Sequence, residues 1–551
     1  MPKVSRRNLI TGAAAVAAGA VAVPTLPPPT AVAQPLADTG TAVCDPAAAA
    51  VVVRPADARY AELSTGVNKR WTASPESIRL VGSTDHVVRV VQEAVRAGKR
   101  VSVRSGGHCY ADFVSNADID IIIDTAGLKQ ISYDAERRAF CVGAGAQLGQ
   151  IYEALYKGWG TTIPGGACLT VGIGGHASGG GFGLLTRKYG LVADHIEAVE
   201  MVVVDSAGTA RSVIVSRGST GAAADLWWAT TGGGGGSFGV ITRYWFRSAG
   251  ATGTDPARQL PAPPKDVLVA LTNVPWSAVD RPALTRLVTN FGDWHVRNGS
   301  VDSPFVSLSG YLLMRQGTGP GAGVGLFTQV DGTDPRAEQL LADYGAAVTR
   351  DTGISPSFPF RRVGWLASTK LVGTASPPLL YDHTLRSSVK TAYLRKSFTE
   401  DQIGAIHRNM TRTDYANVNA AISLNGGGGQ HNAVPPAATA SSHRATAFFA
   451  LYESFWTEQS EDPLHLGWQR DIYGETFANT GGYPVPNDLT DGCYINNPDP
   501  DIMDPAYNKS QVPWHTLYFK DNYARLQRAK AQWDPTDFFR HSQSIRLPGQ
   551  P

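Results

Sequence analysis

Two glycine-rich segments, each with one nucleophilic side chain inside it, constrain this chain most. Residues 104–110 read RSGGHCY, and residues 164–176 read PGGACLTVGIGGH. Glycine lets backbone N–H groups approach a large flat or phosphorylated ligand closely. A nucleophile held at such a surface, here His108 or Cys168, can become covalently joined to that ligand. The two segments therefore predict a cofactor that is attached to the protein twice.

Composition indicates a large folded protein with a small-molecule ligand. The 551 residues are too many for one hydrophobic core, so two or three domains are expected. The formal net charge is +2 and no Lys/Arg-rich run occurs, which argues against nucleic acid or a membrane surface as partner. Many of the 59 glycines cluster, as in 232–236 and 426–429, which indicates close backbone packing near a ligand.

The five cysteines are too few for a disulfide scaffold in a chain of this length. Because the number is odd, at least one thiol is free or committed to other chemistry. Cys168 is the candidate for that thiol. The other four could pair, and the sequence does not fix which pairs would form.

The N-terminus reads as a targeting segment. Arg6 and Arg7 precede an Ala/Val-rich stretch, and an Ala-Val-Ala sequence follows at 31–33. This arrangement predicts a twin-arginine signal peptide over residues 1–33, and hence a secreted or cell-envelope protein exported in the folded state. The alternative is a fortuitous arginine pair before an alanine tract. The apolar run is too short to span a membrane.

Periodicity predicts alternating strands and helices from about Ile78 onward, with a Pro-rich boundary near 250–265. We expect helices over 85–98, 148–156, 225–229 and 514–530, strands over 101–104, 119–124 and 448–456, and a hairpin of 198–204 with 209–215.

A series of ordered motifs resembles one family. After the two segments above come GGGFG (179–183), DLWWA (225–229), GSFGVIT (236–242), YIN (494–496) and a final DP…QSI (534–545). The series is similar to the berberine-bridge-enzyme-like FAD-linked oxidases of the vanillyl-alcohol-oxidase, or PCMH-type, group, and most of all to their bacterial natural-product and sugar oxidases.

That resemblance covers essentially the whole mature chain, and it implies an architecture. The fold class would be α+β with two domains: a PCMH-type FAD-binding fold, and a mixed-sheet substrate domain over the flavin. The boundaries would be an FAD-binding domain over 34–250 (core 72–248), a substrate-binding domain over 251–489, and a C-terminal segment over 490–551 that returns to the FAD domain.

The resemblance also implies bicovalent FAD, with His108 on the flavin 8α-methyl group and Cys168 on C6. Val171 would occupy an oxygen-gating position, where valine admits O₂ and H₂O₂ is released; simple packing is the alternative for this residue. A metal site is not expected, because His176 and His195 have no partner at ligand spacing. The full set of expected cofactor-binding residues is His108, Cys168, Arg104, Ser105, Gly106, Gly107, Cys109, Pro164, Gly165, Val171, Gly172, Gly174, Gly175, His176, Gly180, Gly181, Phe182, Gly183, Gly239, Val240, Tyr494 and Asn496.

The chain departs from the family at three tyrosines that help to remove a hydroxyl proton in related bacterial oxidases. Their positions hold Asn425, Asn497 and Phe182 here. An amide does not titrate near neutral pH, so it cannot serve as a base. Because a well-placed general base contributes about 10²–10⁴-fold, either another group serves or the reaction differs. The two asparagines could instead orient a substrate.

Glu453 is the candidate for the missing base. Plant members of the family place a carboxylate on a strand at a position that matches Leu451, and Glu453 lies two residues further, on the same strand face. A glutamate beside an apolar pocket has a raised pKa and can accept a proton. The alternative is a glutamate at the strand rim that points to solvent or to an arginine.

Three functions remain open from the sequence. The first is an exported FAD oxidase that takes hydride from a small natural-product or sugar-type substrate and passes the electrons to O₂. The second is a flavin-dependent oxidative cyclase or C–C bond-forming dehydrogenase, which the missing tyrosines favour. The third is a flavin-bearing binding protein without turnover. A monomer or a homodimer is expected.

Overall fold

Three β-sheets form the framework of the computed structural model, which describes residues 49–317, 321–355, 358–375 and 382–550. The predicted signal over 1–33, and Cys44 with it, lies outside the described residues. Residues Pro46–Pro551 make up one compact unit. The predicted α+β class is confirmed, and the predicted domain boundaries stay predictions.

The first sheet has four strands in the order β1-β2-β4-β3. Strands β2, β4 and β3 run parallel, and β1 pairs antiparallel with β2. Its strands are β1 (Val51–Val53), β2 (Ser77–Leu80), β3 (Val101–Arg104) and β4 (Ile121–Asp124).

The second sheet has five antiparallel strands in the order β5-β6-β9-β7-β8. The predicted hairpin is its β7–β8 pair, joined at Val204 and Ala210. Its strands are β5 (Ile131–Asp134), β6 (Ala139–Gly143), β7 (Ile196–Val204), β8 (Ala210–Ser216) and β9 (Val240–Phe246).

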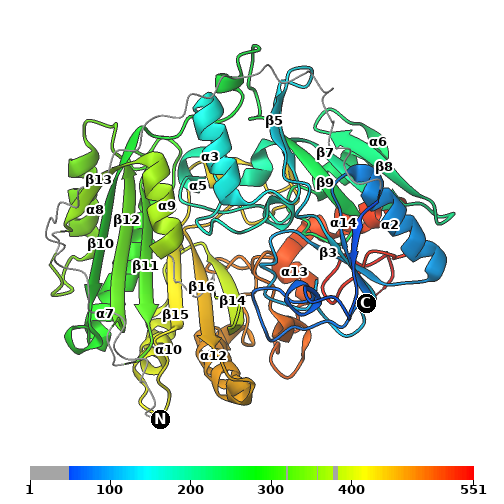
Figure 1. Cartoon of the computed structure of the whole chain (residues 1–551). Helices are drawn as coiled ribbons and strands as arrows, with labels where there is room; N and C mark the ends of the chain where they lie inside the picture. The colour runs from blue at the N-terminus through cyan, green and yellow to red at the C-terminus, as the bar shows by residue number, and fades with distance from the viewer. Residues whose placement is uncertain (1–48, 318–320, 356–357, 376–381, 551) are drawn as a thin grey trace, which may run out of the picture. The chain divides into compact units, whose positions relative to one another are not determined.

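The third sheet has seven strands in the order β13-β10-β12-β11-β15-β16-β14 (Figure 1). A mixed sheet is expected from the resemblance, but every strand pairing in the described sheet is antiparallel. Consecutive strands that run in the same direction do not pair, because β12 lies between β10 and β11, β10 between β12 and β13, and β16 between β14 and β15. Its strands are β10 (Asp266–Val274), β11 (Ser309–Arg315), β12 (Gly323–Asp331), β13 (Phe360–Gly364), β14 (Arg386–Leu394), β15 (Ala420–Gly426) and β16 (Phe448–Trp456).

Helices cover one face of this seven-stranded sheet. Tyr452 of β16 packs edge-on against Tyr473 of α12, so the even-numbered residues there face the helices. Strand side chains alternate between faces, and Leu451 and Glu453 therefore point to the opposite side. The covering helices are α7 (Arg281–Arg297), α8 (Ala337–Val348), α10 (Glu400–Thr411) and α12 (Asp462–Thr476), whereas α9 (Trp365–Ala375) lies against β10, β13 and α3 (Leu148–Trp159).

Local signals explain where several helices begin and end. Helix α2 (Thr84–Ala97) begins after Ser83, whose side chain accepts a hydrogen bond from the His86 N–H, and ends at Gly98 with φ +64°. The predicted helix over 514–530 is interrupted, because Lys520 takes φ +48° between α13 (Trp514–Phe519) and α14 (Tyr523–Trp533). The remaining helices are α1 (Tyr60–Leu63), α4 (Ile173–Ser178), α5 (Thr186–Tyr189), α6 (Gly221–Ala229) and α11 (Gln430–Ala433).

Candidate functional site

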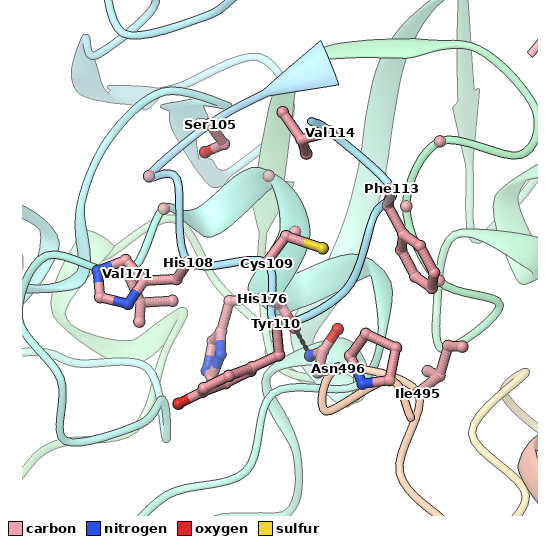
Figure 2. A pocket seen from close by; sticks show the side chains of 18 of the residues that line it. Ser105, His108, Cys109, Tyr110, Phe113, Val114, Val171, His176, Ile495 and Asn496 are labelled. Atoms are coloured by element: carbon pink, nitrogen blue, oxygen red, sulfur yellow. Dashed lines mark hydrogen bonds between the residues drawn. The ribbon is translucent and has the colours of Figure 1, made fainter. Parts of the chain in front are cut away.

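One cavity of about 380 Å³ collects the segments that the sequence analysis singled out. One wall consists of the loop after β3, the segment before α4 and the glycine run 233–236. Residues 494–498 and the C-terminal residues 539–543 contribute to the lining, and β15 and β16 supply the opposite wall. Figure 2 shows part of this lining at close range.

Most of the expected site residues line this cavity. They are His108, Cys168, Ser105, Gly106, Gly107, Cys109, Val171, Gly172, Gly174, Gly175, His176, Phe182, Gly239, Asn425, Glu453, Tyr494, Asn496 and Asn497. Seven expected cofactor residues do not line it: Arg104, Pro164, Gly165, Gly180, Gly181, Gly183 and Val240.

The two nucleophile-bearing segments touch backbone to backbone. A Cβ placed on Gly106 would lie 2.3 Å from the Gly172 nitrogen, so both glycines are needed for the contact. The Ser105 hydroxyl donates to the Ala144 carbonyl at 2.7 Å, and Arg104 Nε donates to Asp124 at the end of β4 at 3.0 Å. Arg104 thus acts behind the cavity wall, where it anchors the first loop to the sheet.

Residues of the C-terminal segment hold the second loop from the other side. The Gly166 N–H donates to His176 Nε2 at 3.1 Å, and Asn496 Nδ2 donates to the His176 carbonyl at 2.9 Å (Figure 2). The Tyr494 hydroxyl accepts the Gly181 N–H at 2.9 Å. The YIN motif is therefore joined directly to the glycine-rich segments, although more than 300 residues separate them in sequence.

Burial sets the protonation of the two candidate attachment residues. The pKa of His108 is lowered to about 4 by burial and, to a smaller degree, by His383, so the imidazole is neutral at pH 7. The pKa of the Cys168 thiol is raised to about 12 by burial, with a further contribution from the charge of Glu453. Neutral imidazole is a nucleophile as it stands, whereas Cys168 must lose its proton to react.

The described cysteines form no disulfide with one another, and all four are free thiols: Cys109, Cys141, Cys168 and Cys493.

Glu453 lies on the cavity face of β16, as the alternation along the strand predicts. Its half-buried side chain has no hydrogen-bond partner among the residues that the structure describes. Burial raises the pKa of its carboxyl from 4.5 to about 7. The carboxyl thus faces the cavity with a pKa close to neutral pH, and no arginine among the described residues pairs with it.

Tyr110 stands near Glu453 and Cys168, and the sequence analysis gave it no role. Its side chain lines the cavity and packs in one apolar cluster with Cys168, Leu385 and Phe455. Burial raises the pKa of its phenol well above 10, and the charge of Glu453 raises it further. Its own carbonyl accepts hydrogen bonds from Asn68 at 2.9 Å and Trp71 at 2.8 Å, which fixes the loop.

The three positions that lack a tyrosine all reach the cavity. The Asn425 side-chain amide is hydrogen-bonded to neighbouring strand residues. Its Nδ2 donates to the carbonyls of Ser423 and Phe449 at 3.2 Å, and its Oδ1 accepts from the Ser423 hydroxyl at 3.1 Å. Phe182 packs against Phe449 at a ring distance of 5.9 Å. Asn497 also lines the cavity, and its backbone N–H donates to the Tyr494 carbonyl at 3.0 Å.

The sequence predicted that the C-terminal segment returns to the FAD domain, but it named none of residues 539–543 as part of this wall. His541 stacks on Phe113 at a ring distance of 3.8 Å, and its Nε2 lies 3.1 Å from the Gly235 carbonyl. Gln543 lines the cavity as well. The run of five glycines and the terminal QSI motif can both be recognised in the sequence, but only the tertiary fold brings the two segments together.

Comparisons with known proteins agree with this geometry. The family model for an FAD binding domain matches residues 75–213, and that for berberine and berberine-like proteins matches residues 493–546. The aclacinomycin-N/aclacinomycin-A oxidase of Streptomyces galilaeus is 43% identical over 549 residues, which is 99% of each chain. The chain belongs to the berberine-bridge-like family of FAD-linked oxidoreductases.

Solved structures share the fold over nearly the whole chain. CrmK, a flavoenzyme involved in the shunt product recycling mechanism in caerulomycin biosynthesis, is 45% identical with a TM-score of 0.87, covering 91% of this chain and 99% of its own. A glycopeptide hexose oxidase complexed with teicoplanin is 43% identical with a TM-score of 0.85, covering 90% and 99%. The enzyme class predicted from the sequence is confirmed.

The cavity residues fit an FAD. Glycines of both loops line the cavity and expose backbone to it, and the 2.0 Å approach of a Cβ on Gly172 to Ser105 Oγ shows that the two loops pack too closely to admit a side chain there. Two nucleophiles line the same cavity, which a flat ring system with two reactive edges would require.

Within the part of the chain that the structure describes, no helix is long and apolar enough to cross a membrane.

Proposed function

We propose that this protein is an exported oxidase that carries FAD on both His108 and Cys168 and oxidises a natural-product or sugar-type substrate. The observation that carries this proposal is the cavity itself: both nucleophiles line it, and a proton-accepting glutamate lies on the strand wall opposite the glycine-rich loops. The names of the aclacinomycin oxidase and the glycopeptide hexose oxidase support the substrate class.

Each residue then has a defined task. Bound FAD would supply the hydride acceptor at N5. Glu453 accepts the proton from the substrate hydroxyl as the hydride leaves, because its pKa of about 7 keeps a substantial fraction ionised at neutral pH. Phe449 and Leu451, on the same strand face, give the substrate an apolar surface beside the carboxyl.

O₂ is the proposed electron acceptor, and H₂O₂ the product. Val171 supports this assignment, since its small side chain lines the cavity next to Gly172 (Figure 2). If valine admits O₂, Val171→Leu slows flavin reoxidation and leaves anaerobic reduction by substrate unchanged. A variant with unaltered reoxidation would show that Val171 only packs.

A second candidate is dehydrogenation followed by cyclisation or C–C bond formation. It is favoured by the three cavity positions at which Phe182, Asn425 and Asn497 stand instead of tyrosine. Mass analysis of the product separates the two functions: an oxidised substrate with stoichiometric H₂O₂ supports the oxidase, and a product with a new ring supports the cyclase.

Two experiments test the covalent flavin and the turnover. Acid precipitation of the purified protein should leave the yellow chromophore in the pellet, and His108→Ala combined with Cys168→Ala should release it. A panel of glycosylated polyketides, glycopeptides and free sugars should then be screened anaerobically for flavin bleaching. A colourless wild-type pellet would refute covalent attachment, and a flavin that no compound bleaches would argue against the oxidase.

Export by the twin-arginine route is a separate part of the proposal, supported by the Arg6–Arg7 pair and the 31–33 cleavage sequence. Because that route carries folded proteins, the flavin would be captured before export. Replacement of both arginines by lysine should retain the protein inside the cell with its flavin attached, and normal export of that variant would contradict the route.

A further inference from the structure

The imidazole of His108 has one nitrogen held by a neighbour. Nε2 lies 2.8 Å from Oγ1 of Thr170, and Nδ1 has no hydrogen-bond partner within the described ranges of the chain. Thr170 lies in the turn that the Val171 N–H closes on the Cys168 carbonyl at 3.3 Å. One short turn therefore carries both the second nucleophile and the hydrogen-bond partner of the first.

A neutral imidazole has one N–H and one lone pair, and the hydrogen bond that one nitrogen makes decides which nitrogen carries the proton. We propose that Thr170 is the positioning residue for flavin attachment: its Oγ1 accepts a hydrogen bond from Nε2–H and so keeps the lone pair of His108 on Nδ1. The inference rests on the proposed covalent flavin, and it assigns a role to a residue that itself forms no bond to the cofactor.

The environment makes this hydrogen bond decisive. The low pKa of His108, about 4, keeps the ring neutral, so the choice between its two tautomers is real at physiological pH. If the threonine hydroxyl instead donated to Nε2, the proton would sit on Nδ1 and the free nitrogen could not attack. Thr170 is β-branched, and its limited χ1 freedom helps to hold the oxygen in one place.

Covalent attachment at His108 oxidises the flavin methyl group by two electrons. A bond forms between Nδ1 and the 8α carbon, while one C–H bond of the flavin 8-methyl group and the Nε2–H bond of the ring break. The two electrons are deposited in the flavin ring, and O₂ takes them up together with two protons to give H₂O₂. Thr170 Oγ1 is the first acceptor on the path of the departing Nε2 proton.

The experiment compares wild type with Thr170→Val and Thr170→Ser, each produced with FAD and digested for peptide mass mapping. Valine keeps the branched shape and removes the hydroxyl, whereas serine keeps the hydroxyl and is the matched control. Flavin is counted separately on the His108 peptide and the Cys168 peptide during a time course of reconstitution. The histidyl-flavin released from wild type is also assigned to Nδ1 or Nε2 by chromatography.

We expect Thr170→Val to attach flavin to His108 about tenfold more slowly, the effect of losing one buried hydrogen bond. Attachment at Cys168 should be unchanged, and serine should restore the His108 bond. Equal attachment at His108 in all three proteins, parallel loss at both residues, or an Nε2-linked flavin in wild type would overturn the role of Thr170. Wild type without flavin on either residue would instead refute the proposed bicovalent cofactor, and this inference with it.

Discussion

Replacement of Glu453 by glutamine should stabilise the protein at alkaline pH. In the folded state burial raises the pKa of this carboxyl to about 7, whereas in the unfolded chain it titrates near 4.5. Below pH 4.5 the group is neutral in both states and has no effect. As the pH rises from 4.5 through 7, the unfolded state ionises first, so wild type loses stability, and the loss is complete above pH 7.

The magnitude follows from the same two values. The gap between 4.5 and about 7 corresponds to about 3 kcal/mol of unfolding free energy. The side chain is only half-buried and faces a cavity that admits water, which screens part of this penalty. We therefore expect Glu453→Gln to gain about 1–2 kcal/mol at pH 8 and nothing at pH 4, or about 1–3 °C in Tm for a chain of this size.

The assay is thermal unfolding of the flavin-loaded protein from pH 4 to pH 9. Glu458→Gln is the matched control, because Glu458 follows the same strand and is exposed. Its difference from wild type should stay near zero across the range. A Glu453→Gln variant that is less stable at pH 8, or whose Tm difference does not change with pH, would refute the reasoning about the buried carboxyl.

The same substitution, Glu453→Gln, should lower the rate of substrate oxidation. Without the base, anaerobic flavin reduction by an accepted substrate should slow by about 10²–10⁴-fold. In wild type that rate should rise with pH through about 7 as Glu453 ionises, and in the variant it should be independent of pH over that range. A glutamine variant with the wild-type rate and pH profile would remove Glu453 from the mechanism.

Two further predictions concern the fold around the cavity. Gly106→Ala places a Cβ 2.3 Å from the Gly172 nitrogen, so it should lower Tm and prevent flavin attachment. Gly158→Ala on α3 is the matched control, because open space surrounds Gly158, and it should raise the free energy of unfolding by about 0.5–1 kcal/mol. Thermal melting and flavin content check both variants. Lys390→Met should cost about 3–5 kcal/mol in chemical unfolding, since Asp499, 2.6 Å from the Lys390 ammonium, would stay buried without its partner, and an unchanged midpoint would contradict this.

Features with a local cause were predictable from sequence. The helix over 85–98 and the strand over 101–104 appear as α2 and β3 within one residue, because an apolar stripe, a serine cap and a glycine stop all lie in or directly next to the segment. The strand over 448–456 is β16 with the same bounds. Its alternation also gave the correct face for Glu453.

Features that depend on chain reversal or long-range docking were not predictable. Strand direction in the seven-stranded sheet follows from connections that leave no periodic signal, and the break at Lys520 follows from a positive φ that lysine rarely adopts. Tyr110 lies two residues after His108 in the sequence. Its place near Glu453 exists only because the first glycine loop packs against the strand wall.

The exchange of tyrosines for a carboxylate is physically consistent with this cavity. Burial raises the pKa of any acid, so it moves Tyr110 further above 10 and away from use as a base, while it moves Glu453 to about 7, where a general base is most effective. Burial thus moves the pKa of the Tyr110 phenol away from neutral pH and moves that of the Glu453 carboxyl toward it. If Glu453 on β16 accepts the proton, as proposed, the positions of Phe182 and Asn425 need no titratable group, and both side chains instead pack against or bond to Phe449 on that same strand.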